Sequence, residues 1–251
     1  MRPLILLFVA ASTFAADLAK LHIFEMAKRG ENVEVAKIST FAAAAYGSPH
    51  MTTPPTPVFR LSDIAFLGAG RKEKLDLYFP SGDFRSNRPA VVFIHGGGFT
   101  GGDKAEYRSA SVSADLCRAG YVVVSCNYVL GPKDKPGVWP QNIADCRNAV
   151  RWLRAHAKEL GVNPDKIAVA GGSAGGYLAL MVGLSDDKTG PGGDPAAKHS
   201  AKVSAVIDMY GVVNFSKHGK GDVLVGAERN FDNPVNPGWL ARELADALAQ
   251  A

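Results

Sequence analysis

The chain has 251 residues, 47% of them hydrophobic and 21% charged, with a formal net charge of +4 at pH 7. This length and composition are ordinary for one soluble domain. The basic residues are interspersed with acidic ones, which argues against nucleic acid or an anionic membrane as a partner. The six histidines are scattered without the spacing of metal ligands, so we expect no metal site.

Residues 1–15 have the pattern of a secretory signal peptide. Arg2 supplies a positive start, residues 4–11 form an apolar run, and small residues precede a cut after Ala15. The apolar run is too short to span a bilayer. We therefore expect a secreted or periplasmic protein with no membrane span after cleavage, and an uncleaved N-terminal anchor is the alternative.

The three cysteines, Cys117, Cys126 and Cys146, cannot all pair with one another. Their spacing matches neither a disulfide framework nor a zinc site. We expect them to be small buried residues of the core.

After the leader, the chain divides into residues 16–57, read as an N-terminal helix and linker, and residues 58–251, the main domain. Helix-forming residues with near-helical apolar spacing predict a helix from Ala16 to about Lys28. Residues 29–56 show no clear period and end in a proline-rich stretch, which predicts an irregular linker.

The main domain opens with two alternating stretches, Phe59–Leu67 and Lys74–Phe79, separated by Gly68–Arg71. This arrangement predicts an antiparallel hairpin. Two continuous apolar runs follow, Ala90–Ile94 and Tyr121–Cys126, as expected for strands covered on both faces. A helix is expected between them, over about 105–119.

Pro140 begins the strongest helical pattern, an apolar stripe that ends before Gly161. A strand at Ile167–Ala170 and an apolar helix at Tyr177–Leu184 come next, then a polar loop over 185–200 and a strand at Val203–Tyr210. Strands that alternate with helices at this spacing predict a mostly parallel sheet with helices on both faces.

The turn between the strand at 167–170 and the helix at 177–184 carries the first chemical motif. Gly171, Ser173 and Gly175 form a Gly-x-Ser-x-Gly pattern. A serine on a sharp strand-to-helix turn has its hydroxyl exposed above the sheet, and small neighbours are needed because the turn leaves little room. A tight turn with a bystander serine is the alternative.

The second motif is His95-Gly96-Gly97-Gly98, directly after a buried strand. Consecutive glycines let the backbone approach a ligand closely and direct N–H groups toward it. A flexible loop is the alternative, but the combination with Ser173 favours acyl transfer.

With these two motifs, the chain resembles α/β-hydrolases of the carboxylesterase branch, which includes hormone-sensitive-lipase-like and feruloyl-esterase-like bacterial enzymes. The resemblance runs from about Val58 to about Phe215. It rests on Lys74–Pro80, His95–Phe99, Asn127-Tyr128, Pro140–Ala157 and Ile167–Gly176. It implies an α/β-hydrolase three-layer sandwich in which the last strands are missing.

The resemblance also implies roles. Ser173 matches the nucleophile, and the backbone N–H groups of Gly97, Gly98 and Ala174 match the oxyanion hole. His95 matches a residue that supports the loop, not the base. No cofactor is implied, because acyl transfer by a serine needs none, and the expected partner is a small-molecule ester.

An acid and a base are not recognisable in the pattern. The family's order is serine, acid, histidine, and only His199 and His218 follow Ser173. His218, with Asp222 near it, is the weak candidate for the base, and both histidines are expected to be solvated loop residues. The expected sixth strand would then be a sheet edge, through which the chain could form an oligomer.

Four functions remain open at this point. The first is a secreted serine carboxylesterase for short-chain or carbohydrate-linked esters. The second is a truncated or inactive hydrolase that lacks the acid and the histidine. A prolyl-oligopeptidase-type peptidase is disfavoured because no large additional domain is present. A binding module that uses the glycine loops as an anion pocket is the fourth.

Overall fold

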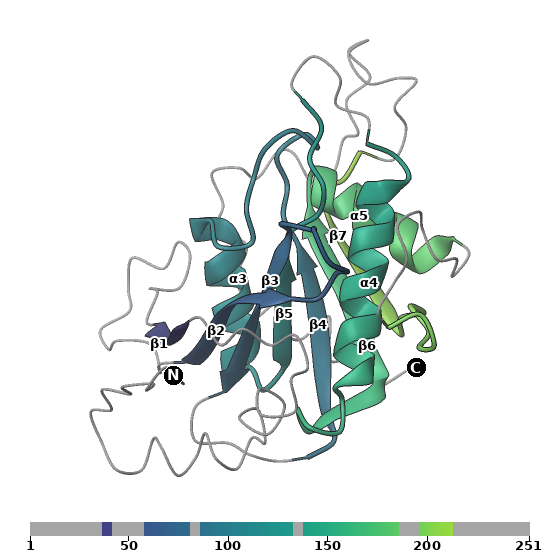
Figure 1. Ribbon diagram of the computed structural model, residues 1–251. Helices are drawn as coiled ribbons and strands as arrows, with labels where there is room; N and C mark the ends of the chain where they lie inside the picture. The colour runs from purple at the N-terminus through teal and green to yellow at the C-terminus, as the bar shows by residue number, and fades with distance from the viewer. Residues whose placement is uncertain (1–36, 42–57, 81–85, 133–137, 186–195, 213–251) are drawn as a thin grey trace, which may run out of the picture.

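The computed structural model describes residues 37–41, 58–80, 86–132, 138–185 and 196–212 (Figure 1). The strands in these ranges form one sheet in the order β1-β2-β3-β5-β4-β6-β7. Their bounds are Lys37–Phe41 for β1, Val58–Ala65 for β2, Lys74–Pro80 for β3, Arg88–Ile94 for β4, Val122–Cys126 for β5, Val162–Gly172 for β6 and Ala205–Met209 for β7.

The sheet is antiparallel at one side and parallel at the other. β2 pairs antiparallel with β1 and with β3, and β3 pairs antiparallel with β5. The pairs β5–β4, β4–β6 and β6–β7 are all parallel. The hairpin of β2 and β3 and the parallel arrangement of the later strands are therefore confirmed.

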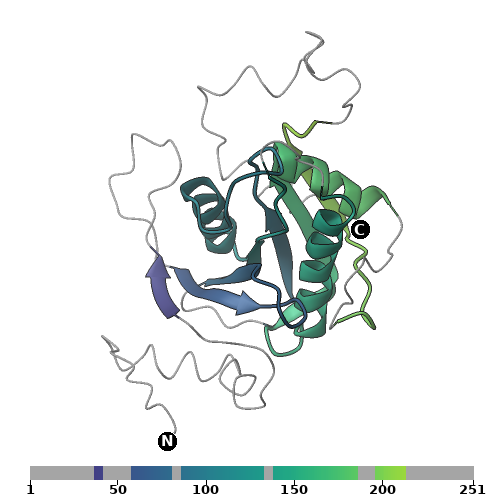
Figure 2. The ribbon, with the colours of Figure 1, turned by 45° about the horizontal axis from the view of Figure 1, so that its top comes forward.

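Within the described ranges, three helices cover the two faces of this sheet. Helix α3 (Tyr107–Arg118) lies on one face, and α4 (Gln141–Ala155) and α5 (Ala174–Leu184) lie on the other (Figures 1 and 2). Side chains alternate along a strand, so Val91 and Phe93 pack toward α3 while Val92 and Ile94 pack toward α4 and α5. Each such fully buried side chain contributes roughly 1.5–3 kcal/mol through removal from water. The three-layer α/β-hydrolase sandwich is confirmed.

The pairing of β4 with β6 positions the two glycine motifs. In this parallel pair Ile94 lies opposite Gly171. Both strands therefore end at the same edge of the sheet, and the segments that follow them, 95–98 and 173–176, start as neighbours.

Several bounds differ from the expectation. The prediction of an irregular linker over 29–56 was wrong at 37–41, where β1 pairs with β2. A strand this short is defined by backbone hydrogen bonds to its neighbour. Such pairing does not require an alternating pattern of apolar and polar residues in the strand itself. β6 begins at Val162, before the expected Ile167. α5 begins at Ala174, not Tyr177, because a helix N-terminus accepts glycines where a tight turn precedes it.

All three cysteines are buried, as predicted, and their thiols are free. Within the described ranges, no helix is long and apolar enough to cross a membrane. The expected helix at 16–28, the leader at 1–15, and the candidates His218 and Asp222 lie outside the described residues.

Candidate active site

Ser173 lies at the junction of β6 and α5 in a strained backbone conformation. Its φ is 56° and its ψ is −121°, a region that non-glycine residues rarely adopt. Two backbone hydrogen bonds hold it there, from its own N–H to the carbonyl of Met209 (3.0 Å) and from the N–H of Tyr177 to its carbonyl (3.1 Å). The residue is partly exposed, and its side chain makes no capping hydrogen bond. The hydroxyl is thus held at the carboxyl edge of the sheet.

The glycines around Ser173 are required by close packing. A Cβ atom on Gly171 would lie 2.3 Å from the carbonyl oxygen of Gly175, and one on Gly175 would lie 2.1 Å from the carbonyl oxygen of Ile94. Real Cβ atoms do not approach backbone oxygens so closely. The start of α5 therefore packs directly against the end of β4, which brings the turn up to the second glycine motif.

The loop after β4 touches the serine turn. A Cβ atom on Gly96 would lie 3.3 Å from the Cβ of Ser173 and 2.8 Å from the carbonyl oxygen of Gly172. Gly97 and Gly98 are exposed and have φ angles of 113° and 61°. The structure therefore brings Ser173 and the glycine loop together, as the sequence predicted.

Ala174, the third predicted oxyanion-hole residue, is the first residue of α5 and is buried. The first N–H groups of a helix have no partner inside the helix. They also lie at the positive end of the helix dipole, which favours negative charge. This N–H and the exposed glycine loop thus flank the position of the serine side chain.

His95 supports the glycine loop from beneath. Its ring is buried, stacks on Tyr128 with centroids 4.4 Å apart, and donates from Nδ1 to the carbonyl of Gly96 at 2.7 Å. A neutral imidazole that donates from Nδ1 has no proton on Nε2. Burial lowers the pKa of His95 below its ordinary value, so the ring stays neutral in this environment. Its position agrees with a supporting role and not with that of the base.

Polar side chains hold the far end of the same loop. Asp103 accepts from the side chain of Asn127 (2.8 Å) and from the N–H of Ala105 (2.7 Å), and Asn127 in turn accepts from the N–H of Lys104 (2.7 Å). The Lys104 ammonium contacts Asp63 at 2.7 Å and the fully buried Asp76 at 2.8 Å. Burial alone would lower the pKa of Lys104, but these two carboxylates outweigh it and raise that pKa. The lysine therefore remains charged and ties the loop to β3.

Three aromatic side chains lie on the helix side of the turn. Phe99, from the glycine loop, meets Tyr177 edge to face with ring centroids 5.8 Å apart. The ring centroid of Trp139 lies 6.5 Å from that of Tyr177, and 51% of the surface of Trp139 is exposed. Tyr177 is one helical turn beyond Ser173. These rings form an apolar wall beside the serine, which the sequence analysis did not identify because its members come from three separate segments.

The described histidines do not supply a base. His156 donates from Nδ1 to the carbonyl of Trp152 and stacks on that ring, and the carbonyl of His199 accepts from Arg151. Among the described residues, no hydrogen bond links an imidazole to Ser173. His199 is half-buried, so the expectation that it is a solvated residue was only partly met.

Asp208 occupies the end of β7 and faces the start of α5. Its Oδ1 accepts from the N–H of Gly211 at 2.6 Å, and a Cβ on Gly176 would lie 2.1 Å from that atom. Burial raises the pKa of this carboxyl, although its bond to Gly211 opposes the shift. Asp208 thus holds the turn after β7 and has no described imidazole partner. Among the described residues, no group of three or more His, Cys, Asp or Glu residues could hold a metal ion.

A family model, BD-FAE, matches residues 75–249. The chain belongs to this family of α/β-hydrolase esterases. The match includes both glycine motifs, and it extends beyond Phe215, where we expected the resemblance to end.

Curated relatives carry the same class of description. The chain is 34% identical over 158 residues to a probable carboxylic ester hydrolase, LipM, of Mycobacterium tuberculosis, covering 62% of this chain and 35% of that protein. It is 30% identical over 192 residues to the esterase LipQ of the same organism, covering 74% and 43%. The chain therefore spans less than half the length of these relatives.

Solved structures agree with the fold. A thermophilic esterase from Thermogutta terrifontis with propionate bound superposes with a TM-score of 0.52 at 27% identity, covering 75% of this chain and 60% of that one. A truncated carbohydrate esterase from gut microbiota has a TM-score of 0.53 at 23% identity, covering 69% and 60%, and shows the shared fold alone.

Beyond the aromatic wall, the sequence analysis missed the ion pairs beneath the loop. One signal was available: Asp76 stands between two leucines in a strand that is otherwise apolar after Lys74. A charged residue in such a strand indicates a buried partner. Its partners Arg60 and Lys104 are far from it in sequence, so they could not have been named.

Proposed function

We propose that the chain is a secreted serine carboxylic-ester hydrolase in which Ser173 attacks the ester carbonyl. The observation that carries this proposal is the contact between the strained, partly exposed Ser173 and the glycine loop at Gly96. Membership of an esterase family supports it. Export rests on the signal-peptide pattern of residues 1–15.

In the proposed reaction, the Oγ of Ser173 bonds to the carbonyl carbon and the carbonyl oxygen becomes negative. The N–H groups of Gly97, Gly98 and Ala174 stabilise that charge. A base takes the proton of Ser173 and gives it to the alcohol oxygen as the C–O bond to the alcohol breaks, which leaves an acyl-enzyme that water hydrolyses. His218 with Asp222, outside the described residues, is the candidate for this base.

Short-chain or carbohydrate-linked esters are the proposed substrates. The Thermogutta terrifontis esterase has been solved with propionate and with butyrate bound. A bifunctional GH43-CE protein of Bacteroides eggerthii superposes with a TM-score of 0.53 at 25% identity, covering 67% of this chain and 25% of that one. The aromatic wall of Phe99, Trp139 and Tyr177 offers apolar surface to an acyl chain or to a sugar ring.

Covalent labelling tests the role of Ser173. We expect a fluorophosphonate probe to label the purified protein and to leave Ser173→Ala unlabelled. Hydrolysis of p-nitrophenyl acetate should fall at least about 10³-fold in that variant. Ser86→Ala is the matched control, because Ser86 is exposed at the amino end of β4, on the opposite edge of the sheet. Equal turnover by Ser173→Ala and the unmodified protein would exclude chemistry at this serine.

An inactive hydrolase that binds esters is the second candidate. It is favoured by the lack of any hydrogen bond from a described histidine to Ser173. Such a protein would show ester binding without turnover and without labelling by the probe. Labelling together with turnover excludes it.

A further inference from the structure

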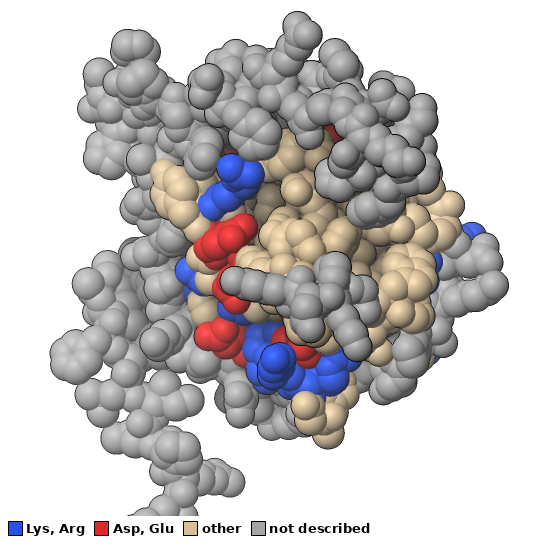
Figure 3. Space-filling model, turned by 90° about the horizontal axis from the view of Figure 1, so that it is seen from above, with Lys and Arg blue, Asp and Glu red and all other residues tan. Residues whose placement is uncertain are grey.

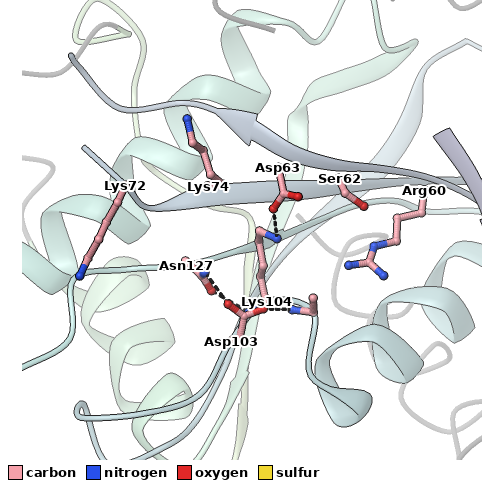
Figure 4. Close-up of a pocket in the computed structure, with 9 residues that line it drawn as sticks. Arg60, Ser62, Asp63, Lys72, Lys74, Asp103, Lys104 and Asn127 are labelled. Carbon is pink, nitrogen blue, oxygen red and sulfur yellow. Dashed lines mark hydrogen bonds and ion pairs between the residues drawn. The ribbon is translucent and has the colours of Figure 1, made fainter. Parts of the chain in front are cut away.

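A polar pocket of about 450 Å³ opens beside the far end of the glycine loop. Its walls come from β2, from the start of β3 and the residues before it, from the segment 103–105, and from Asn127 after β5. Figure 4 shows Lys72 and Lys74 at one end of the pocket and Arg60 at the other, with Lys104 and Asp103 along one side. Neither the predicted nor the observed catalytic geometry uses this pocket.

The inner cations of the pocket are already neutralised. Arg60 pairs with Asp76 at 2.5 Å, and Lys104 pairs with both Asp76 and Asp63. Two cations and two carboxylates therefore balance. Asp76 is fully buried and Lys104 is 4% exposed, so this floor is rigidly held.

The rim of the pocket carries an excess of positive charge, because two lysines, Lys72 and Lys74, face one carboxylate, Asp103. No hydrogen bond or ion pair involves the ammonium groups of Lys72 and Lys74 in the part of the chain that the structure describes. Lys72 is exposed and Lys74 is half-buried. Asp103 is the remaining carboxylate of the lining, and its hydrogen bonds to Asn127 and Ala105 leave further acceptor positions open. The pocket thus offers ammonium donors for an anion and carboxylate acceptors for hydroxyl groups.

The pocket lies at the same edge of the sheet as Ser173. Adjacent strands are about 4.8 Å apart, so the end of β5 is about 10 Å from the end of β6, and the start of β3 is about 14 Å away. Viewed from this edge, acidic and basic side chains gather along one side of a surface whose centre is formed by uncharged side chains (Figure 3). A group bound in the pocket would therefore lie one or more sugar units from an ester at Ser173.

We propose that this pocket binds a uronate, an acidic sugar unit in the carbohydrate part of the ester substrate. Lys72 and Lys74 at the rim attract the carboxylate, and Asp103, Asp63 and Asn127 contact the hydroxyl groups. The assignment rests on the proposed function, since it names the substrate class of the same site. It accounts for a mixed lining that neither a simple anion nor a neutral sugar would require.

Ligand-observed NMR titration tests the proposal. The probes are sodium D-glucuronate and D-glucose, which differ in the carboxylate at one carbon. We expect the protein to bind glucuronate about tenfold more tightly than glucose, because the two rim ammonium groups together favour the carboxylate by about that factor. Raising the ionic strength from about 0.01 M to about 0.15 M should weaken glucuronate binding, since screening shortens the range of exposed charges.

The decisive variant is Lys72→Gln/Lys74→Gln, which keeps most of each side chain and removes both charges. It should lose the preference for glucuronate and bind it about tenfold more weakly. The matched control is Lys158→Gln/Lys166→Gln, with the same change in net charge at exposed lysines near the start of β6, at the opposite edge of the sheet. Equal affinity for glucuronate and glucose, or equal losses in the two double variants, would overturn the proposal. Sodium phosphate that competes as strongly as glucuronate would overturn the sugar assignment.

The failure of this inference is separable from failure of the proposed function. Binding is measured in both the unmodified protein and Ser173→Ala, where it should be unchanged, because the pocket does not include the serine. Hydrolysis of p-nitrophenyl acetate by the unmodified protein tests the esterase assignment independently, since that ester has no acidic sugar. If the unmodified protein binds glucuronate but does not hydrolyse p-nitrophenyl acetate, only the esterase assignment is contradicted. If it hydrolyses the ester but does not prefer glucuronate over glucose, only the uronate site is contradicted.

Discussion

The two glycine-rich segments at the carboxyl edge of the sheet are held in place by different forces. The turn at 171–176 is held by packing: Gly171 and Gly175 lie against the carbonyl oxygen of Ile94 in β4, and an added Cβ would not fit at either position. The loop at 96–102 leaves Gly97 and Gly98 exposed. Backbone hydrogen bonds from Thr100 and Gly101 to the carbonyl of Gly97 close it, and its ends are held by His95 beneath it and by Asp103 and Lys104 beyond it. A nucleophile must be held at one fixed position, and a tightly packed turn holds Ser173 in this way. A loop that must approach a ligand needs free surface, so its support comes from side chains at its margins.

The largest effect should come from the buried charge that supports the loop. Asp76→Asn leaves Arg60 and Lys104 without their shared carboxylate, and breaking a buried pair in this way costs about 3–5 kcal/mol. We expect the free energy of unfolding, measured by urea denaturation, to fall by that amount. Asp63→Asn is the control, because that carboxylate is 55% exposed and contacts the same lysine. It should cost less than about 1 kcal/mol, and equal losses would show that the network is not organised around Asp76.

The same substitution in both glycine segments compares them directly. Gly175→Ala places a Cβ 2.1 Å from the carbonyl oxygen of Ile94, and overpacking of this kind costs about 1–3 kcal/mol or more. Gly98→Ala finds no atom within 4 Å, and its cost is the backbone strain of a φ of 61°, about 1–2 kcal/mol at most. Urea denaturation should rank Gly175→Ala as the more damaging. Gly68→Ala, which also meets nothing within 4 Å, should stay within about 0.5 kcal/mol. A larger loss at Gly98 than at Gly175 would contradict the distinction.

The histidine beneath the loop should make stability depend on pH. Burial lowers the pKa of His95 below its ordinary value of 6.5, which the unfolded chain retains. Below pH 6.5 the unfolded state therefore binds a proton that the native state does not. The free energy of unfolding should fall as the pH is lowered from about 7 to 5, by up to about 1.4 kcal/mol per pH unit. Above pH 7 both states are neutral and the effect is absent.

His95→Gln isolates that contribution, because the amide can still donate to Gly96 but does not titrate in this range. Urea denaturation at several pH values should give a flatter profile for the variant between pH 5 and 7. Profiles of the same slope would assign the pH dependence to other groups.

The smallest effect concerns the aromatic wall, where the two segments meet through Phe99 and Tyr177. Trp139→Ala removes a half-exposed ring, and an aromatic contact is worth about 0.5–1.5 kcal/mol. We expect kcat/KM for p-nitrophenyl butyrate to fall about threefold to tenfold, and less for the acetate. Tyr107→Ala, at a ring 60% exposed on α3, is the control and should leave both values unchanged. A loss of the same size for both esters would mean that Trp139 does not contact the acyl chain.

The sequence by itself determined the layers of the fold and the two motifs, because both are local. Runs such as Ala90–Ile94 are apolar on both faces only if helices cover both sides, and Ser173 among glycines describes a turn with its own steric demands. The tertiary structure alone decided what lies across from each motif. Asp76 pairs with Lys104, Trp139 lies near Tyr177, and Lys72 and Lys74 line one pocket with the segment 103–105, all through strand order and register. Contacts between distant segments depend on that register, and no period or motif within a segment records it.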